Sequence, residues 1–565
     1  MRKQQRNERY FLEAAITLAL LAGPVPALAA DSTQDAEYKA SGGLELINAA
    51  AAYEQGYTGK GVTLGICDQP INFASPEFNQ KQASSMVNTA LYKGKTVSVY
   101  PWADLNHGTH VAGIAAASRN GIGMQGVAYD AEVMGSSAGG NYLTGGQFAA
   151  SLTAFDAYLQ DDAVKVINNS WGGGHYVDQK GNFDSSGTYT MIENAASQDK
   201  LVIFAAGNGG HPTPAQESLT GYRNNAAWRN ILSVTNVDGS AVTLSGGRFT
   251  VSRGATDGLL SITSDAAKYA EDWTLGAPGS YILSANANFA ADGQLDVVMS
   301  GTSMAAPFVT GTGALVQQAF PYLSAKQIGD VLLSTANSSV SGAEITCDLQ
   351  QDEGKLSINA FVQGEKNTES EAAAKAAMDA LNGELFSQYQ TEVRHYYYNV
   401  PLQELIGQGI VDAGAAVKGP GALNARRLVA ADCSEAYTVG GTKTAQALYT
   451  VDTAAYDSVW SNAIKEIQAD YIAADSGETD LQERWKYYDT NWLSYTGPED
   501  RETARGVTQT LLWLYNENVK ATGLRGLHVG LYKTGAGTLS LTGANTYAGT
   551  TVAAGGMACS SRTTP

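Results

Sequence analysis

Short apolar runs rich in Val and Ile recur along the first half of the chain and alternate with stretches of helical spacing. The apolar runs are KGVTLGIC at 60–67, AEVMGSS at 131–137, VKVINNS at 164–170, LVIFAAG at 201–207 and NILSVTNV at 230–237. Helix-compatible segments lie near 107–118, 144–159 and 189–198. This alternation predicts an α/β fold in which an open parallel sheet carries helices on both faces. Because such sheets place functional groups at the carboxyl ends of their strands, we expect Asp68 and Asn208 to lie there.

The pattern changes after residue 300. Residues 301–320 predict a long apolar helix with Ser303 at its start, and a second helix is expected near 324–336. Residues 340–400 are largely acidic and polar and include TESEAAAKAAMDALNGELF, a stretch of strong helix formers. We interpret this stretch as part of a surface insertion.

Two further segments complete the chain. Residues 440–526 hold four tryptophans among charged residues at helical spacing, which predicts a small helical module; they are Trp460, Trp485, Trp492 and Trp513. Residues 527–556 alternate apolar and polar positions between Gly and Asn turns, which is typical of one rung of a β-solenoid, and 557–565 form a short tail. A single rung cannot bury a core by itself, because stacked repeats need neighbours.

Length and charge narrow the class of protein. The 565 residues exceed what one hydrophobic core usually organises, so we expect two or three structural units. Acidic residues outnumber basic ones by 55 to 36, for a formal charge of −19, and no long Lys/Arg block is present. Without such a basic block the chain has no stretch that could follow a phosphate backbone, so we expect no nucleic-acid partner.

The cysteines support neither a disulfide scaffold nor a clustered zinc site. Only four occur, widely spaced, at Cys67, Cys347, Cys433 and Cys559. Alternation along a strand would point Cys67 and Asp68 to opposite faces, which favours Cys67 as a small buried residue. A Cys347 to Cys433 bridge in an oxidising compartment stays open at this point.

The N-terminal segment 1–29 has the three parts of a secretory signal peptide. Basic residues are followed by the apolar run AAITLALLAG, then by two prolines and small residues ahead of Ala30. The run is too short to cross the ~30 Å hydrocarbon core of a bilayer. We therefore expect an exported protein, located in the periplasm, at the cell surface or in the medium.

Three segments each carry one member of a catalytic triad. GVTLGICD ends in Asp68, HGTHVAGIAA begins with His107, and SGTSMAAPFVTG contains Ser303. A seryl hydroxyl is a weak nucleophile at neutral pH, so hydrolysis needs a base to take its proton and a carboxylate to orient that base. The order Asp, His, Ser along the chain is the order found in subtilisin.

Together with VINNSWGG and VIFAAGN, these segments resemble the subtilisin-like serine proteases. The resemblance implies a catalytic domain over 45–427, interrupted by the insertion at 340–400. It also implies that His107 acts as general base, that Asp68 orients it, and that Asn208 and the backbone amide of Ser303 form the oxyanion hole.

The same resemblance predicts how a polypeptide substrate binds. Ser170, Trp171 and Gly172 would supply main-chain groups to which the substrate adds as an extended strand. Gly207 would keep the opposite wall of the pocket low. No charged residue falls among 168–174 or 205–210, so we expect apolar or aromatic side chains at the cut site.

The C-terminal sequence resembles autotransporter passengers. GQGIVDAGAAVKGPGALN is similar to the closing helix of autotransporter subtilases, and 527–556 is similar to the passenger-associated repeat. Autotransporters end in a membrane β-barrel, and we expect none after Gly556, so association with the outer membrane would require a barrel supplied elsewhere. A monomeric serine endopeptidase is the expected function. The alternative is a catalytically idle passenger that acts as an adhesin or binding module.

Two other features are interpreted conservatively. His110 follows His107 by three residues, but no third ligand clusters nearby, so it is expected to be a core histidine. The loop QPINFASPEFNQ after Asp68 presents no recognisable calcium-binding cluster. We expect the reaction to require no cofactor, and calcium binding stays open.

Overall fold

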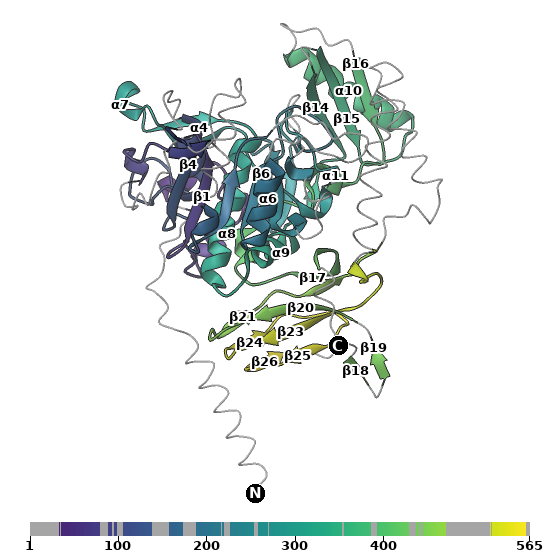
Figure 1. Cartoon of the computed structure of the whole chain (residues 1–565). Helices are drawn as coiled ribbons and strands as arrows, with labels where there is room; N and C mark the ends of the chain where they lie inside the picture. The colour runs from purple at the N-terminus through teal and green to yellow at the C-terminus, as the bar shows by residue number, and fades with distance from the viewer. Residues whose placement is uncertain are drawn as a thin grey trace, which may run out of the picture.

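A computed structural model gives the fold of the chain (Figure 1). The residues that it describes are 33, 35–69, 71–78, 89–92, 95–98, 106–137, 158–172, 188–215, 217–219, 227–252, 258–268, 270–352, 355–385, 393–428, 437–439, 442–444, 446–470, 520 and 522–560. The expected signal peptide therefore lies outside the described residues. Among those that are described, no helix combines the length and apolar character needed to cross a membrane.

A six-stranded parallel sheet forms the centre of the catalytic unit, as predicted. Its strands, in spatial order, are β10 (Thr274–Pro278), β7 (Ile231–Val237), β6 (Leu201–Ala205), β5 (Val164–Asn169), β1 (Thr63–Asp68) and β4 (Glu132–Ser137). All neighbouring strands pair in parallel. Strand β10 comes from TLGAP, which is too short and too poor in β-branched residues to stand out in the sequence. The strand order reverses at β1, which places the end of that strand at a switch point.

Helices flank this sheet and include four that the sequence predicts. They are α4 (Asn106–Ala116), α6 (Thr188–Ser197), α8 (Thr302–Ala319) and α9 (Ala325–Thr335). Helix α8 is buried along most of its length and packs on the sheet and on α4. Pro307 is tolerated because it lies in the first turns, where amides lack carbonyl partners inside the helix. Most of the predicted helix 144–159 falls outside the described residues.

Smaller elements surround this core. The short helices are α2 (Ala36–Ala40), α3 (Ala49–Tyr53), α7 (Phe289–Asp292), α11 (Leu402–Ile406) and α12 (Ala413–Ala416). The minor strands are β2 (Thr89–Tyr92), β3 (Lys95–Ser98), β8 (Val242–Ser245), β9 (Arg248–Val251), β11 (Ile282–Ala285), β12 (Asp296–Met299), β13 (Val340–Ser341), β18 (Tyr437–Val439) and β19 (Thr442–Thr444). Most of them form hairpins, and none of them belongs to the central sheet.

The segment interpreted as an insertion is a small α/β unit. It consists of β14 (Ile345–Asp352), β15 (Lys355–Val362), α10 (Thr368–Leu385) and β16 (Val393–Tyr397). Strands β14 and β15 form a hairpin, and α10 crosses over so that β16 pairs in parallel with β15. The predicted helix formers lie within α10, whose buried side packs on the hairpin. Figure 1 shows this inserted unit at the opposite end of the molecule from the C-terminal strands.

The C-terminal region is a stack of parallel strands. Strands β20 (Ala447–Asp452), β23 (Val529–Thr534) and β25 (Thr551–Ala553) form one sheet, and β21 (Ser458–Trp460), β24 (Thr538–Leu541) and β26 (Met557–Ser560) form a second. Strand β22 (Lys465–Ile467) pairs with β17 (Ala422–Asn424) of the catalytic unit. The predicted solenoid segment 527–556 is thus confirmed as β-structure. It contributes to two rungs where one was expected, since β25 pairs with β23 and β26 pairs with β24; the outer rung is formed by β25 and β26. Residues 447–467 provide the neighbouring first rung.

The prediction of a helical module over 440–526 is wrong where the structure has strands β19, β20, β21 and β22. Within β20, burial alternates in part, with Tyr449 and Val451 inside and Thr450 and Asp452 exposed. A period of two suits a strand, and each strand is completed by a neighbour far along the chain. The spacing of the tryptophans misled the prediction. Trp485, Trp492 and Trp513 lie outside the described residues.

Candidate active site

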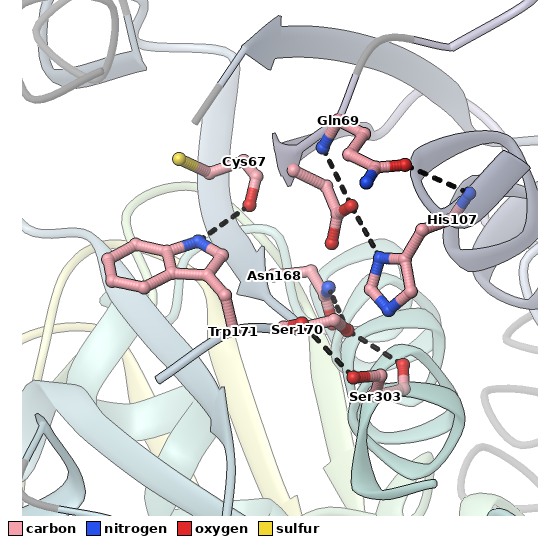
Figure 2. Close-up of polar contacts among 8 residues, drawn as sticks. Cys67, Gln69, His107, Asn168, Ser170, Trp171 and Ser303 are labelled. Atoms are coloured by element: carbon pink, nitrogen blue, oxygen red, sulfur yellow. Dashed lines mark hydrogen bonds and ion pairs between the residues drawn. The ribbon is translucent and has the colours of Figure 1, made fainter. Parts of the chain in front are cut away.

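Asp68 and His107 are joined where β1 ends and α4 begins. Nδ1 of His107 lies 2.7 Å from Oδ1 of Asp68 (Figure 2). The carboxylate side chain is 2% exposed, whereas the imidazole is 31% exposed. A buried carboxylate on Nδ1 holds the proton on that nitrogen and leaves Nε2 as the basic atom. The first two members of the predicted triad are therefore in the expected relationship.

Gln69 forms hydrogen bonds with both members of this pair. Its backbone N–H donates a hydrogen bond to Oδ1 of Asp68 at 2.7 Å. Its side-chain Oε1 accepts a hydrogen bond from the backbone N–H of His107 at 3.2 Å. One residue thus ties the end of β1 to the first turn of α4. Sequence reasoning missed Gln69, because an amide residue beside a motif carries no signal of its own.

Ser303 lies at the second position of α8 and contacts the segment that follows β5. Its hydroxyl donates to the main-chain oxygen of Ser170 at 3.1 Å, and the hydroxyl of Ser170 donates to the main-chain oxygen of Ser303 at 2.7 Å. Asn168 donates from Nδ2 to the same Ser170 hydroxyl at 2.9 Å. In Figure 2 the ring of His107 points toward Ser303. The three triad residues therefore converge, with the seryl hydroxyl resting on Ser170 in this conformation.

Asn208 is held beside the start of α8 by Thr302. Its Oδ1 accepts hydrogen bonds from the backbone N–H of Thr302 at 2.9 Å and from the Thr302 hydroxyl at 3.1 Å. A backbone N–H can only donate, so the side-chain oxygen of Asn208 must face Thr302. The Nδ2 group of this exposed residue then faces the other way, available as a donor. This is the orientation that an oxyanion hole requires.

Gly301 permits the close approach of these segments. Its φ of 148° belongs to the region that side chains rarely adopt, and a Cβ there would lie 3.3 Å from Oδ1 of Asn208. The N–H of Ser303, in the first turn of α8, is one of the amides that a helix leaves without an internal carbonyl partner. The sequence prediction pairs it with Asn208.

The predicted substrate-binding residues lie along the same edge. Ser170 is buried, Trp171 is half-buried and Gly172 is exposed. The Trp171 indole N–H donates to the main-chain oxygen of Cys67 at 2.9 Å (Figure 2). The Trp171 ring also packs edge-on against Phe204. The Trp171 side chain thus anchors the segment to the strand that carries Asp68. Substrate binding by the main-chain groups of 170–172 stays a prediction.

Two carboxylates distant in sequence lie next to the predicted substrate-binding glycines. A Cβ on Gly172 would lie 3.3 Å from Oε2 of Glu217, and a Cβ on Gly207 would lie 1.9 Å from Oδ2 of Asp265. Both side chains are buried, at 4% and 0% exposure. The expectation of an apolar cut site considered only residues 168–174 and 205–210, so it could not include them. That preference stays a prediction.

His110 is a core histidine, as predicted. It is fully buried in α4, and its Nε2 lies 3.1 Å and 3.0 Å from the main-chain oxygens of Ile282 and Val297. Burial lowers the pKa of His110 to about 4, so the ring is neutral at physiological pH. It is then a donor to two carbonyls and not part of the catalytic chemistry.

The buried Glu77 and the half-buried Asp296 lie together away from the triad. A Cβ on Gly123 would lie 2.2 Å from Oε1 of Glu77 and 2.5 Å from Oδ2 of Asp296. Burial, followed by the charges of Asp296 and Glu37, raises the pKa of Glu77 to about 9, and burial raises that of Asp296 to about 6. No group of three or more His, Cys, Asp or Glu side chains placed to hold a metal ion occurs within the described ranges.

The proposed bridge between Cys347 and Cys433 is not tested, because Cys433 lies outside the described residues. Cys67 is 1% exposed, as the strand pattern predicts. Its burial within β1 agrees with a packing role.

Comparison with known proteins identifies two families in the chain. The Subtilase family matches residues 59–372, just over half of the chain, and the Passenger-associated-transport-repeat family matches residues 531–558. The second match covers β23, β24 and β25, which lie in the stacked strands of Figure 1.

Curated relatives agree with the Subtilase match. An extracellular serine protease of Serratia marcescens is 29% identical over 491 residues, which cover 75% of this chain and 42% of that protein. Subtilisin E of Bacillus subtilis is 29% identical over 303 residues, which cover 52% of this chain and 65% of that protein. The chain thus spans about two fifths of the length of the Serratia relative.

The Subtilase match includes the strand ending in Asp68, the helix that begins beside His107 and the helix carrying Ser303. The resemblance drawn from the sequence motifs is therefore confirmed over the elements that build the site. On these grounds the chain belongs to the subtilase family.

Proposed function

We propose that the protein is an exported serine endopeptidase that hydrolyses peptide bonds with Ser303 as nucleophile and His107 as general base. The observation that carries this proposal is the 2.7 Å contact between His107 and Asp68 beside the first turn of α8. A histidine oriented by a buried carboxylate and pointing toward a seryl hydroxyl has the parts needed for acyl transfer.

In the proposed reaction, rotation of the Ser303 side chain moves Oγ from the Ser170 carbonyl to Nε2 of His107. The hydroxyl then exchanges one hydrogen bond for another, so the rotation costs little free energy. Oγ attacks the substrate carbonyl carbon while His107 takes its proton. The imidazolium, stabilised by Asp68, returns the proton to the leaving amine, and water completes the hydrolysis in a second, equivalent step.

Asn208 stabilises the tetrahedral intermediate in this proposal. The oxygen of the scissile carbonyl becomes negative as the C–O bond to Ser303 forms. Nδ2 of Asn208 and the N–H of Ser303 donate to it, and the hold of Thr302 on Oδ1 keeps the amide oriented beforehand. No metal or organic cofactor takes part in these steps, because the side chains supply the base, the nucleophile and the donors.

The substrates are polypeptides in this proposal. An extended chain can pair with the main chain of 170–172, which leads from β5 to the nucleophile. Main-chain recognition tolerates many sequences and suits an endopeptidase. We retain the expectation of apolar or aromatic residues at the cut site.

Export to the cell surface or the medium is the proposed location. The passenger-associated repeat at 531–558 supports this location. The Serratia relatives, which are named extracellular serine proteases, support it as well. The signal peptide predicted at 1–29 would start the route. A monomer is proposed, since each element of the site comes from the one chain.

Labelling with a fluorophosphonate probe tests the chemistry directly. We expect the probe to modify Ser303 in the purified protein. In Ser303→Ala we expect both the labelling and the cleavage of a denatured protein substrate to be lost. A binding module would retain its effect on target cells in Ser303→Ala. Undiminished peptide hydrolysis in that variant would contradict the proposal.

A further inference from the structure

The inserted unit contacts the loop that carries Asn208. This loop, residues 206–211, follows β6 and is here called the oxyanion loop. Asn359 of β15 donates from Nδ2 to the main-chain oxygen of Gly210 at 3.2 Å, and both residues are buried. The backbone N–H of Leu349 in β14 donates to the main-chain oxygen of Ile262 at 2.5 Å. The hairpin of the insertion thus contacts both the oxyanion loop and the segment 258–268, which contains Ile262.

The segment 258–268 holds the oxyanion loop through Asp265. Oδ1 of Asp265 accepts hydrogen bonds from the N–H of Gly209 at 2.9 Å and from the N–H of His211 at 2.8 Å. The N–H of Asp265 itself donates to the main-chain oxygen of Gly207 at 2.9 Å. Asn208 therefore lies between two glycines that the same buried aspartate fixes.

The insertion also brings a second buried carboxyl group near this aspartate. Asp348 lies directly opposite Asn359 in the β14–β15 hairpin, and both side chains are 0% exposed, as is Asp265. Neither carboxyl oxygen of Asp348 has a hydrogen-bond partner among the described residues. Burial, followed by the charge of Asp265, raises the pKa of Asp348 well above its usual value. Burial therefore disfavours the charged form of the Asp348 carboxyl group, which lies within electrostatic range of Asp265.

We propose that the inserted unit is a positioning element for catalysis, in which Asn359 and the buried Asp265 hold the oxyanion loop so that Asn208 meets the developing negative charge. The inference rests on the proposed function, because it assigns a role relative to the oxyanion. Asn359 and Asp265 form hydrogen bonds with the main chain of the oxyanion loop. They act through Gly207, Gly209 and Gly210, the glycines around Asn208.

Steady-state kinetics on a chromogenic peptide amide tests the proposal. Donors to the oxyanion act in the transition state and not in the ground state, so their misplacement lowers kcat and leaves KM nearly unchanged. We expect Asn359→Ala to lower kcat about tenfold, less than the ~10²- to 10³-fold expected for loss of the donor in Asn208→Ala. A matched control is Gln363→Ala, which removes a side-chain bond to the Ala343 carbonyl within the same unit and should leave kcat unchanged.

A double-mutant cycle separates positioning from general loss of structure. If Asn359 acts only through Asn208, then Asn208→Ala/Asn359→Ala is no slower than Asn208→Ala alone. An equal loss of kcat from Asn359→Ala in both backgrounds would overturn the proposal.

Asp265 supplies a second, independent variant pair. Asp265→Asn retains an acceptor oxygen for Gly209 and His211 and should keep most of kcat, whereas Asp265→Ala should lose about tenfold. Equal losses in these two variants would overturn the assigned role. Ser303→Ala separates the positioning role from the proposed function. If Ser303→Ala abolishes hydrolysis while Asn359→Ala and Asp265→Ala keep the original kcat, the positioning role fails and the proposed function stands.

Discussion

The indole N–H of Trp460 donates a hydrogen bond to the hydroxyl of Tyr322 at 3.0 Å, and so joins the C-terminal strands to the catalytic unit. Trp460 is fully buried in β21, and Tyr322 lies in the turn between α8 and α9. The Tyr322 hydroxyl in turn donates to Ser458 at 2.8 Å. Buried residues of β20, β21 and β23 belong to the same hydrophobic core as the central sheet. The first rung of the solenoid is therefore part of the catalytic unit's core.

Truncation of Trp460 should destabilise the catalytic unit as well as the solenoid. Trp460→Ala removes a large buried side chain and leaves a cavity, at a cost of ~3–5 kcal/mol. We expect a lower Tm for the whole protein, measured by calorimetry, with a loss of peptidase activity over the same temperature range. Val459→Ala, at a 46% exposed neighbour on the same strand, is the control and should leave Tm nearly unchanged. Independent melting of the solenoid, with peptidase activity retained, would contradict a shared core.

Lys533 satisfies carbonyl groups inside the solenoid. This fully buried lysine in β23 donates from Nζ to the main-chain oxygens of Gly535, Gly537 and Gly555. Gly555 belongs to the turn before β26, so the ammonium group links successive rungs. Lys533→Met would leave these carbonyls without their donor, and an unsatisfied buried polar group costs ~1–3 kcal/mol.

We expect Lys533→Met to loosen the outer rung. Hydrogen exchange should become faster in β25 and β26, where backbone bonds depend on the stacking, and should change little in the central sheet. Lys465→Met replaces an exposed lysine of β22 and is the matched control. Unchanged protection of 551–560 in Lys533→Met would show that this ammonium group does not hold the rungs together.

The sequence predicted the parts of the molecule that depend on local pattern. Strands such as LVIFAAG, and the helix that carries Ser303, follow from hydrophobic periodicity. The triad followed from motifs, because each member lies at the end of an element whose position the sheet dictates. Glu217, Asp265 and Asn359 could not be found in this way, since they reach the site through loops and an insertion that carry no motif. Strands β20 and β21 were missed because their partners lie in a distant rung.

Thr302 should matter for turnover although it is not part of the triad. Its hydroxyl donates to Oδ1 of Asn208 and accepts from the N–H of Gly207 at 3.2 Å. Thr302→Val keeps the shape of the side chain and removes both bonds, so Asn208 loses part of its orientation. We expect kcat to fall about tenfold with KM within twofold. Thr302→Ser restores the hydroxyl and should recover most of the rate; a Ser variant as slow as Val would contradict the role of this hydroxyl.

The buried Glu77, next to the half-buried Asp296, predicts a pH-dependent stability. Burial raises the pKa of Glu77 to about 9 in the folded protein, from an ordinary value of 4.5. The folded state therefore holds this proton more tightly than the unfolded state. Its contribution to stability is fully present below the lower value and is lost as pH rises toward the higher one.

Between pH 5 and 9, Tm should accordingly fall more steeply in the wild-type protein than in Glu77→Gln. The amide is neutral at every pH and removes the cost of ionising a buried carboxyl group beside Asp296. Glu54→Gln, at an exposed position in the same N-terminal part of the chain, is the control and should follow the wild-type curve. Thermal unfolding is measured with a chelator present. A parallel series with added calcium decides whether the pair is stabilised by protons alone: a rise in Tm that calcium causes in the wild type and not in Glu77→Gln would contradict the proton account, because paired carboxylates are also the oxygen ligands that this cation takes.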